Sequence, residues 1–513
     1  MKRILIILTI ISGAVFSCAP LDTTPKDFVA PKFYFSTEAQ INNALTGVYD
    51  ILGNSTILYV GNDGLLTYFD AADQMFHNSS DRPPVYVYSA ADSWPLSLWQ
   101  TLYRGIERAN LLLANIDKPE MSEEKRKVMK GEAQFLRAYY YFVLVQNFGA
   151  VPLRIEPTAS VSDIYFERTP AAEVYDFIYK EMAEAEGLVQ PITNFNHAGR
   201  VTKSAIQGVL ARVSLYMGGF PNNRTEKFKD ALQWSTKLID SKLHDLNPNY
   251  SQIFINLIQN KYDTKESIWE VECYTTGATD PYGETGSLGI NNGIRQDLTE
   301  YGFGGPQYRV HEKYYKLFEE TDTRRDWNIA PYTFVVNSSP PVKQFWTATQ
   351  IYDRFIGKYR REYELVSDKI KNNTGTNFSL VRYADVLLMA AESENEVNGP
   401  TEKAIGYLNA VRKRAGVKPI TTFTGKDDFR KMIQDERSRE LGFEGWRRLD
   451  LIRWGIFLST MKALVPYVQQ TAPATHRANA SRAGQNVAER HIYLPIPLRE
   501  LSLNKLLTQN PGW

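Results

Sequence analysis

Apolar residues recur at intervals of three and four along most of the chain, the spacing of one face of an α-helix. The first such stripe follows Thr37 and includes Ile41, Leu45 and Val48. The same spacing predicts further helices at residues 98–116, 124–149, 171–188, 203–217 and 227–241. Glycine and proline follow several of the stripes, as expected where a helix ends. The chain is therefore predicted to be mainly α-helical.

Two adjacent stripes, within residues 383–417, predict a pair of helices. Gly399 and Pro400 stand between them, and a proline suits the first turn of the second helix. Gly416 is predicted to end that helix. Helix pairs of this length are typical of tetratricopeptide-like repeats, so the scaffold is predicted to consist of such pairs.

Long stretches without periodicity separate the helical blocks. Residues 53–96 are irregular, residues 274–308 are rich in glycine, and residues 327–350 mix short β-like runs with a pair of prolines. Long loops in a compact chain are either functional or disordered. Because these loops carry many aromatic residues, which disordered segments lack, we expect them to form the functional face.

The N-terminus reads as an export signal. Lys2 and Arg3 precede an apolar run that is too short to span a bilayer. The following VFSC sequence resembles the lipobox of bacterial lipoproteins, although Phe16 is bulkier than the usual small residue. We therefore expect a signal peptide at 1–17, a lipid on Cys18, a tether over 18–35 and a single domain over 36–513. The alternative is that Cys18 is a free or cleaved-off cysteine.

Composition narrows the choice of partner. The chain has 59 Lys and Arg against 58 Asp and Glu, and it has no basic tract. This balance argues against nucleic acid as the main ligand. The other cysteine, Cys273, lies in the apolar run SIWEVEC and is predicted to be a small buried side chain. Thirty tyrosines, 25 phenylalanines and nine tryptophans are more than the core is expected to need.

Motifs for catalysis are absent from the sequence. The six histidines are scattered, with neither HExxH nor a cysteine–histidine spacing for a metal. Glu436, Glu440 and Glu444 share a helix face and could in principle act as acid and base. Five arginines are interleaved with them (437, 439, 447, 448 and 453), which favours a structural ion-pair network with Trp446 and Trp454 packed beneath it. No catalytic residue, metal site or cofactor is predicted.

Seven stretches, together with the lipobox, occur in the order found in one family. They are WQTLYRGIERANLLLANI, GEAQFLRAYYYFVLVQNFGAVPL, RVTKSAIQGVLARVSLYMGG, RYADVLLMAAESENEVNG, AIGYLNAVRKRAGV, ERSRELGFEGWRRLDLIRWG and YLPIPLRELSLNKLLTQNPGW. Through them, nearly the whole chain resembles the SusD/RagB family of outer-membrane nutrient-binding lipoproteins. The last residue, Trp513, departs slightly from the family, whose members often end in a different aromatic residue.

The resemblance implies an α-rich fold, in which four tetratricopeptide-like helix pairs carry a loop-rich face with short β elements. It also implies a lipid anchor at Cys18 in the outer membrane, with the domain facing the cell exterior. Members capture oligosaccharides, or in some cases peptides, without catalysis. They pass the ligand to a SusC-like TonB-dependent transporter, which they cap.

The resemblance locates the ligand face but does not transfer individual binding residues. It places that face on residues 59–96 and 274–308, with 327–350 nearby. Flat aromatic rings and planar polar groups are the side chains that bind sugars. The candidates are Asp70, Asp73, His77, Arg82, Trp94, Tyr274, Tyr282, Asn291, Asn292, Arg295, Tyr301, Trp327 and Trp346. Among them, Trp94, Tyr282 and Trp327 are expected to be stacking platforms.

A second hypothesis is a helical-repeat lipoprotein whose ligand is another protein. Such an adaptor would use the concave surface of its helices. The long aromatic loops favour the glycan-binding interpretation instead.

Overall fold

The computed structural model describes residues 34–54, 57–61, 70, 72–80, 82–160, 165–275, 285–296, 301–336, 338, 340–366, 369 and 371–513. Helices dominate this part of the chain, as the apolar spacing predicts. The predicted signal peptide, Cys18 and nearly all of the predicted tether lie outside the described residues.

The longer helices are α3 (Glu38–Tyr49), α5 (Ser93–Asn115), α6 (Glu123–Phe148), α7 (Ala171–Glu186), α8 (Lys203–Gly218), α9 (Lys227–Asp240), α10 (Tyr250–Ile258), α13 (Tyr383–Asn398), α14 (Glu402–Arg414), α15 (Lys426–Glu440), α17 (Phe457–Thr471) and α18 (Ala474–Asn486). The shorter ones are α11 (Glu312–Tyr315), α12 (Arg325–Asn328), α16 (Arg447–Arg453) and α19 (Leu498–Leu503), with 3-10 turns η1 (Pro83–Val85), η2 (Ile192–Asn194), η3 (Arg361–Tyr363) and η4 (Glu489–Ile492). The strands are β1 (Met75–His77), β2 (Ser267–Val271), β3 (Tyr308–Val310), β4 (Tyr332–Phe334), β5 (Lys343–Phe345) and β6 (Phe378–Arg382). Within the described chain the strands pair antiparallel as β1–β3, β2–β6 and β4–β5.

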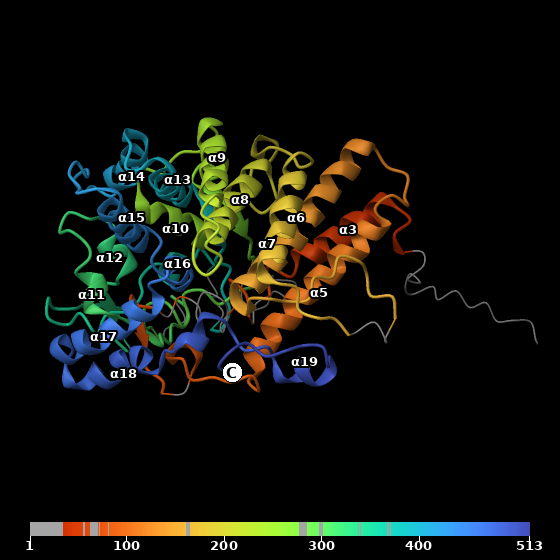
Figure 1. Cartoon of the computed structure of the whole chain (residues 1–513). Coiled ribbons are helices and arrows are strands. Elements are labelled where there is room, and N and C mark those ends of the chain that lie inside the picture. Colours follow the sequence, from red (N-terminus) through yellow and green to blue (C-terminus); the bar gives the residue numbers. More distant parts are fainter. Residues whose placement is uncertain are drawn as a thin grey trace, which may run out of the picture.

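The scaffold is a row of helices in which each packs on the next. Helices α5 to α9 follow one another in this way, α9 packs against α13, and α13 packs against α14 (Figure 1). Helices α17, α18 and α19 lie along the lower edge of the molecule in the same view, and α19 packs against α5. The helix-pair scaffold predicted from the sequence is confirmed.

The α13–α14 pair shows how the sequence sets helix ends. Helix α13 ends before Gly399, whose φ of 85° is a conformation that glycine adopts without strain. The hydroxyl of Thr401 accepts a hydrogen bond from the Ala404 N–H (3.3 Å) and caps α14. Pro400 therefore precedes the cap, whereas the sequence placed it in the first turn. Gly416 follows the end of α14 with a φ of 75°, as predicted.

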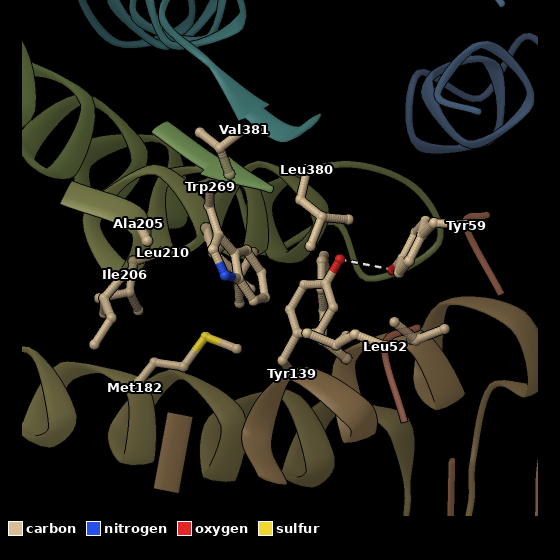
Figure 2. Close-up of a cluster of buried hydrophobic side chains, with 14 of the residues drawn as sticks. Leu52, Tyr59, Tyr139, Met182, Ala205, Ile206, Leu210, Trp269, Leu380 and Val381 are labelled. Carbon is tan, nitrogen blue, oxygen red and sulfur yellow. Dashed lines mark hydrogen bonds between the residues drawn. The ribbon is translucent and has the colours of Figure 1, made fainter. Parts of the chain in front are cut away.

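The largest core cluster lies between the helices and the β2–β6 ribbon (Figure 2). The ring of Trp269 on β2 meets Tyr139 of α6 edge to face, at 4.8 Å between centroids. The Tyr139 hydroxyl forms a hydrogen bond with that of Tyr59 (2.6 Å), a residue of the irregular stretch after α3. Scaffold helices and the start of the loop face therefore share one core. Cys273 is buried beside it, as predicted.

A buried ion-pair network lies where β6 meets the end of α15. The Arg382 guanidinium pairs with Glu266 (3.0 Å), Glu440 (3.0 Å) and Glu444 (2.8 Å). All four side chains are almost completely buried. Lys358 joins the network through Glu444, with its Nζ 2.6 Å from Oε1.

Further arginines extend the network from distant parts of the chain. Arg324 pairs with Glu436 (2.6 Å) and Glu440 (3.1 Å), and Arg414 pairs with Glu440 (2.5 Å). Burial alone would raise the pKa of Glu440, but Arg414, Arg382 and Arg324 together hold it well below its usual value. All three spaced glutamates are sealed inside the protein and paired with basic side chains, as the structural interpretation of this helix predicted.

The partners of these glutamates differ from those that the sequence suggested. Of the interleaved arginines, Arg439 pairs with Glu436 (2.8 Å), while the others project to different sides of the helices. Arg437 and Arg453 pair with Asp450, Arg447 pairs with Asp73, and Arg448 donates to the His491 carbonyl. The two tryptophans contact other charged groups: the Arg212 guanidinium lies 4.0 Å from the Trp446 ring, and Trp454 donates to Glu392.

Replacing Glu440 by glutamine should destabilise the protein strongly, because it leaves Arg382, Arg414 and Arg324 short of a carboxylate in a buried site. Breaking a buried pair in this way typically costs about 3–5 kcal/mol. The measurement is the free energy of unfolding in urea at neutral pH. Asp435→Asn is the matched control on the same helix, since Asp435 pairs with the exposed Lys431 and should change stability by less than about 1 kcal/mol. Equal effects of the two substitutions would contradict this account.

Candidate functional site

The three loop regions of the predicted ligand face meet around one pocket of about 370 Å³. This volume lies in the range of small-ligand sites, about 300–1,000 Å³. Its lining consists of Asn78, Arg295, Gln296, Phe303, Gly304, Gly305, Pro306, Arg309, Val336 and Phe355. Residues from 59–96, 274–308 and 327–350 thus border the same space.

The β1–β3 ribbon positions Arg309 at this pocket. Side chains alternate between the two faces of a strand. Tyr308 and Val310 are buried in a small apolar cluster, so Arg309 between them faces the other side. Its guanidinium lies 4.8 Å from the centroid of the Phe355 ring, and its Nη1 donates to the Asp353 carbonyl (2.6 Å). Both contacts fix the orientation of the guanidinium.

An antiparallel backbone bridge forms the opposite wall. Gln296 and Gly304 exchange two backbone hydrogen bonds of 3.0 and 2.8 Å. A Cβ at Gly304 would lie 2.2 Å from the Ile294 carbonyl oxygen, so no other residue fits there without moving the wall. The half-buried ring of Phe303, next to Gly304, lines the pocket.

Arg361 holds this wall from behind. Its Nη1 donates to the Phe303 carbonyl (2.8 Å) and its Nη2 to the Asn373 carbonyl (3.1 Å). Its Nε donates to Glu364 (2.7 Å), and the side chain is almost completely buried. Lys358, three residues earlier, belongs to the ion-pair network. Residues 358–361 therefore connect the network to the pocket.

Two polar groups of the pocket have unused hydrogen-bonding capacity. The Arg295 side chain is exposed and forms no ion pair or hydrogen bond with any described residue, although the backbone carbonyl accepts a hydrogen bond from the Phe334 N–H (3.3 Å). The Gln296 amide donates to the Tyr301 carbonyl (2.7 Å), but its buried Oε1 accepts no hydrogen bond from the described residues. A buried polar atom without a partner is costly unless a ligand or water satisfies it.

The lining is suited to binding. Among the described residues, no carboxylate, histidine, cysteine or hydroxyl side chain lines this pocket. The described chain also holds no group of three or more histidine, cysteine, aspartate or glutamate side chains placed to hold a metal ion. A flat ring, amides and guanidinium groups remain, which can take up a polar ligand with an apolar face.

Two other cavities have several polar groups that are already paired. A groove of about 480 Å³ between α5, residues 152–166 and α19 contains the Gln100–Glu500 hydrogen bond (2.9 Å), and the Tyr103 hydroxyl donates to the Pro152 carbonyl (2.7 Å). A pocket of about 320 Å³ beside Tyr49 contains the His197–Glu272 pair. The loop-face pocket is therefore the stronger candidate.

Several predicted site residues are buried and support the loops instead of lining the pocket. The Asp73 carboxylate accepts two hydrogen bonds from Arg447 (2.7 and 2.8 Å). Burial raises the pKa of Asp70 to about 7. His77 donates from Nε2 to the Gln307 amide oxygen (2.9 Å) and accepts from the Ser79 N–H (2.8 Å).

Asn292 and Trp327 are buried too. The Asn292 amide oxygen accepts from the Gly289 N–H (2.8 Å), which closes a turn. The Trp327 ring packs against the Arg360 guanidinium, at 4.3 Å from the ring centroid, and is 7% exposed. Its expected role as a stacking platform is therefore not supported by its position, because its faces are covered.

The remaining candidates lie in different places. Tyr301 and Trp346 lie behind the pocket wall, and the Trp346 ring packs on Phe355 with 6.1 Å between ring centroids. The backbone carbonyl of Asn291 accepts a hydrogen bond from the Gln307 N–H. Trp94 packs on Tyr88 outside the pocket, and Arg82 and Tyr274 are exposed elsewhere. Tyr282 lies outside the described residues. Among the described candidates, Arg295 is the one that lines the pocket.

Phe303, Arg309 and Phe355 line the pocket but are not among the residues predicted from the sequence. Phe303 stands in the glycine-rich run GFGGP, a pattern that indicates a tight turn presenting a ring. Arg309 alternates with two apolar residues in YRV, which is the signature of a strand with one solvent-facing side chain. Phe355 carries no local signal, because only the fold brings it beneath Arg309.

Comparisons with known proteins agree with this architecture. A sequence model of the "SusD family" matches residues 251–513, and one described as "Starch-binding associating with outer membrane" matches residues 21–215. The chain is 28% identical to SusD-like protein P25 of Formosa agariphila, covering 99% of this chain and 98% of that protein. It is 23% identical to the starch-binding protein SusD of Bacteroides thetaiotaomicron, covering 77% and 74%.

Solved structures show the same fold. A SusD homologue from Bacteroides thetaiotaomicron superposes with a TM-score of 0.86 at 25% identity, covering 94% of this chain and 98% of that one. Surface glycan-binding protein A from Bacteroides fluxus gives 0.73 at 25% identity, covering 93% and 100%. A laminarin-binding SusD-like protein, at 24% identity and a TM-score of 0.72, covers 93% and 100% and shares the fold.

Replacing Trp327 by alanine should lower the melting temperature, because loss of a buried aromatic side chain costs about 3–5 kcal/mol. Phe303→Ala should leave the melting temperature close to that of the parent, since the Phe303 ring is half-buried at the pocket. Thermal unfolding followed by circular dichroism separates the two. A large loss of stability in Phe303→Ala with none in Trp327→Ala would reverse the assignment of core and pocket.

Proposed function

The chain belongs to the SusD family, and from this premise we propose that its loop-face pocket binds an oligosaccharide at the cell surface without transforming it. The ring of Phe303 stacks against the apolar face of a sugar. Gln296 Oε1 accepts a hydrogen bond from a sugar hydroxyl. The guanidinium groups of Arg295 and Arg309 donate hydrogen bonds to hydroxyl or ring oxygens.

The observation that carries this proposal is the composition of the pocket wall. It combines one accessible aromatic ring with polar groups that have no partner among the described residues. Such a combination matches a sugar, which has an apolar face of C–H groups and a rim of hydroxyls. Its relatives add support, since they include a starch-binding protein and a surface glycan-binding protein.

The proposal includes no catalysis. The spaced glutamates of α15 and the residues after it are enclosed by arginines and cannot reach a ligand in the pocket. A glycosidase would need two accessible carboxyl groups flanking the bond that it cleaves.

Localisation and partner form the second part of the proposal. Cys18 carries the lipid anchor in the outer membrane, and the bound ligand passes to a SusC-like TonB-dependent transporter. The match of the outer-membrane-associated family to residues 21–215 supports this location. Among the described residues, no helix combines the length and the apolar composition that a membrane crossing requires.

Isothermal calorimetry against a panel of oligosaccharides should identify at least one binder. Phe303→Ala should weaken that binder by about 1–3 kcal/mol, the usual cost of losing a stacking aromatic. Tyr274→Ala is the matched control, because Tyr274 is an exposed aromatic on the same insert that does not line the pocket. Equal affinity of Phe303→Ala and the parent would place the site elsewhere, and binding of peptides alone would favour a peptide-binding member of the family.

Cell fractionation should recover the parent protein with membranes and the Cys18→Ala variant in the soluble fraction. Affinity purification of the parent from solubilised outer membranes should also recover a barrel protein of roughly 100 kDa, the size expected from the family resemblance. Unchanged membrane association of Cys18→Ala, with no acyl mass at the N-terminus, would contradict the anchor. Recovery of this protein alone in several mild detergents would contradict the partner.

A further inference from the structure

The charged side chains among the described lining residues of the loop-face pocket are all positive. Arg295 and Arg309 line it, and no aspartate or glutamate is among the described lining residues. Neutral sugars are bound by side chains that both accept and donate, and carboxylates are efficient acceptors for their hydroxyls. The described lining, with two guanidinium groups and no carboxylate, donates more hydrogen bonds than it accepts.

The two guanidinium groups are close enough to affect each other. Burial lowers the pKa of Arg309, the Asp353 carboxylate opposes this shift, and the positive charge of Arg295 adds to it. The Arg309 side chain is 20% exposed, so this repulsion is only partly screened by water. The empty pocket therefore holds two like charges near one another.

The Asp353 carboxylate neutralises the positive charge of Arg309 only weakly. The Asp353 carboxylate is 3.9 Å from Arg309 Nη1, at the limit of an ion pair, and its Oδ1 already accepts a hydrogen bond from His476 Nε2 (2.8 Å). Arg295 has no ion pair with any described residue. Among the described residues, the positive charge of Arg295 and Arg309 is therefore only weakly balanced.

We propose that the pocket takes a saccharide with a negatively charged substituent, a carboxylate or a sulfate ester, bound between Arg295 and Arg309. This inference rests on the proposed function and names the ligand class of the same site. The planar guanidinium matches carboxylate and sulfate oxygens with paired N–H donors, and such charged hydrogen bonds are about twice as strong as neutral ones. Phe355 and the Asp353 carbonyl hold Arg309 in one orientation before the ligand arrives, which lowers the cost of binding.

Phe303 and Gln296 complete the recognition. The Phe303 ring stacks on the sugar that carries the charge. The Oε1 atom of Gln296, which has no partner among the described residues, accepts a hydrogen bond from a hydroxyl of that sugar. The charged substituent and the sugar ring are thus bound by separate walls of one pocket.

The test begins with calorimetry on a panel that contains neutral, uronate-bearing and sulfated oligosaccharides. Each charged binder is then compared with its own carboxyl-reduced or desulfated form, so that only the charge changes. We expect the parent protein to lose affinity by about tenfold or more on removal of the charge. Whichever modification has this effect identifies the anion as carboxylate or sulfate. Affinity for the charged form should also fall as sodium chloride is raised from 50 to about 500 mM.

Arg295→Gln is the decisive variant, because this exposed side chain supports no described contact and its loss should leave the melting temperature unchanged. It should weaken the charged ligand by about tenfold or more and the neutralised form little. Arg82→Gln is the matched control, an exposed arginine of the loop face that does not line the pocket. Arg309→Lys serves as a second variant, which keeps the charge but removes the paired donors.

A best ligand that is neutral, bound equally by the parent and by Arg295→Gln, would overturn the inference while leaving the proposed function intact. Equal losses in Arg295→Gln and Arg82→Gln would also overturn it, because they indicate attraction to the surface in general. Failure of every saccharide, neutral or charged, to bind would refute the proposed function itself.

Discussion

The buried ion-pair network around Arg382 is the constraint on which the rest of this structure depends. Three glutamates from two distant segments of the chain converge on one guanidinium, and all these groups are almost completely buried. A buried charge is tolerated only when its partners are correctly placed, so the network fixes how β6, α15 and the segment before β2 meet. Because an incorrectly docked loop would leave a charge unpaired, the network acts on geometry more than on net stability.

This constraint reaches the pocket through three basic residues within the segment 358–361. Lys358 belongs to the network, Arg360 holds the carbonyls of residues 326 and 327, and Arg361 holds the carbonyl of Phe303. The wall of the pocket is thus attached to the helical scaffold by side chains, although it consists of turns and short strands. A rigid wall lets a small number of contacts bind a flexible sugar without the cost of ordering the protein as well.

The sequence predicted the helices and the location of the loop face, because apolar spacing and glycine–proline breaks act locally. It also identified Glu436, Glu440 and Glu444 as structural, although their main partners, Arg324, Arg382 and Arg414, come from distant segments. Residue type alone does not show which side chains of a loop reach the pocket. Trp327 and His77 were selected by residue type, which does not reveal that the fold buries them, whereas Phe303 and Phe355 line one pocket only because the fold brings their distant segments together. Local pattern determines elements, and long-range packing determines which side chains of a loop face a ligand.

The most direct test of this account is a crystal structure of the protein with the oligosaccharide that binds it most tightly. The account predicts density for a sugar ring against Phe303, with its polar substituents within hydrogen-bond distance of Arg309 and Gln296. Residues 358–361 should keep the positions that they have without ligand. Density for the sugar in the groove between α5 and α19, against Tyr103 and Phe166, with the loop-face pocket empty, would contradict it.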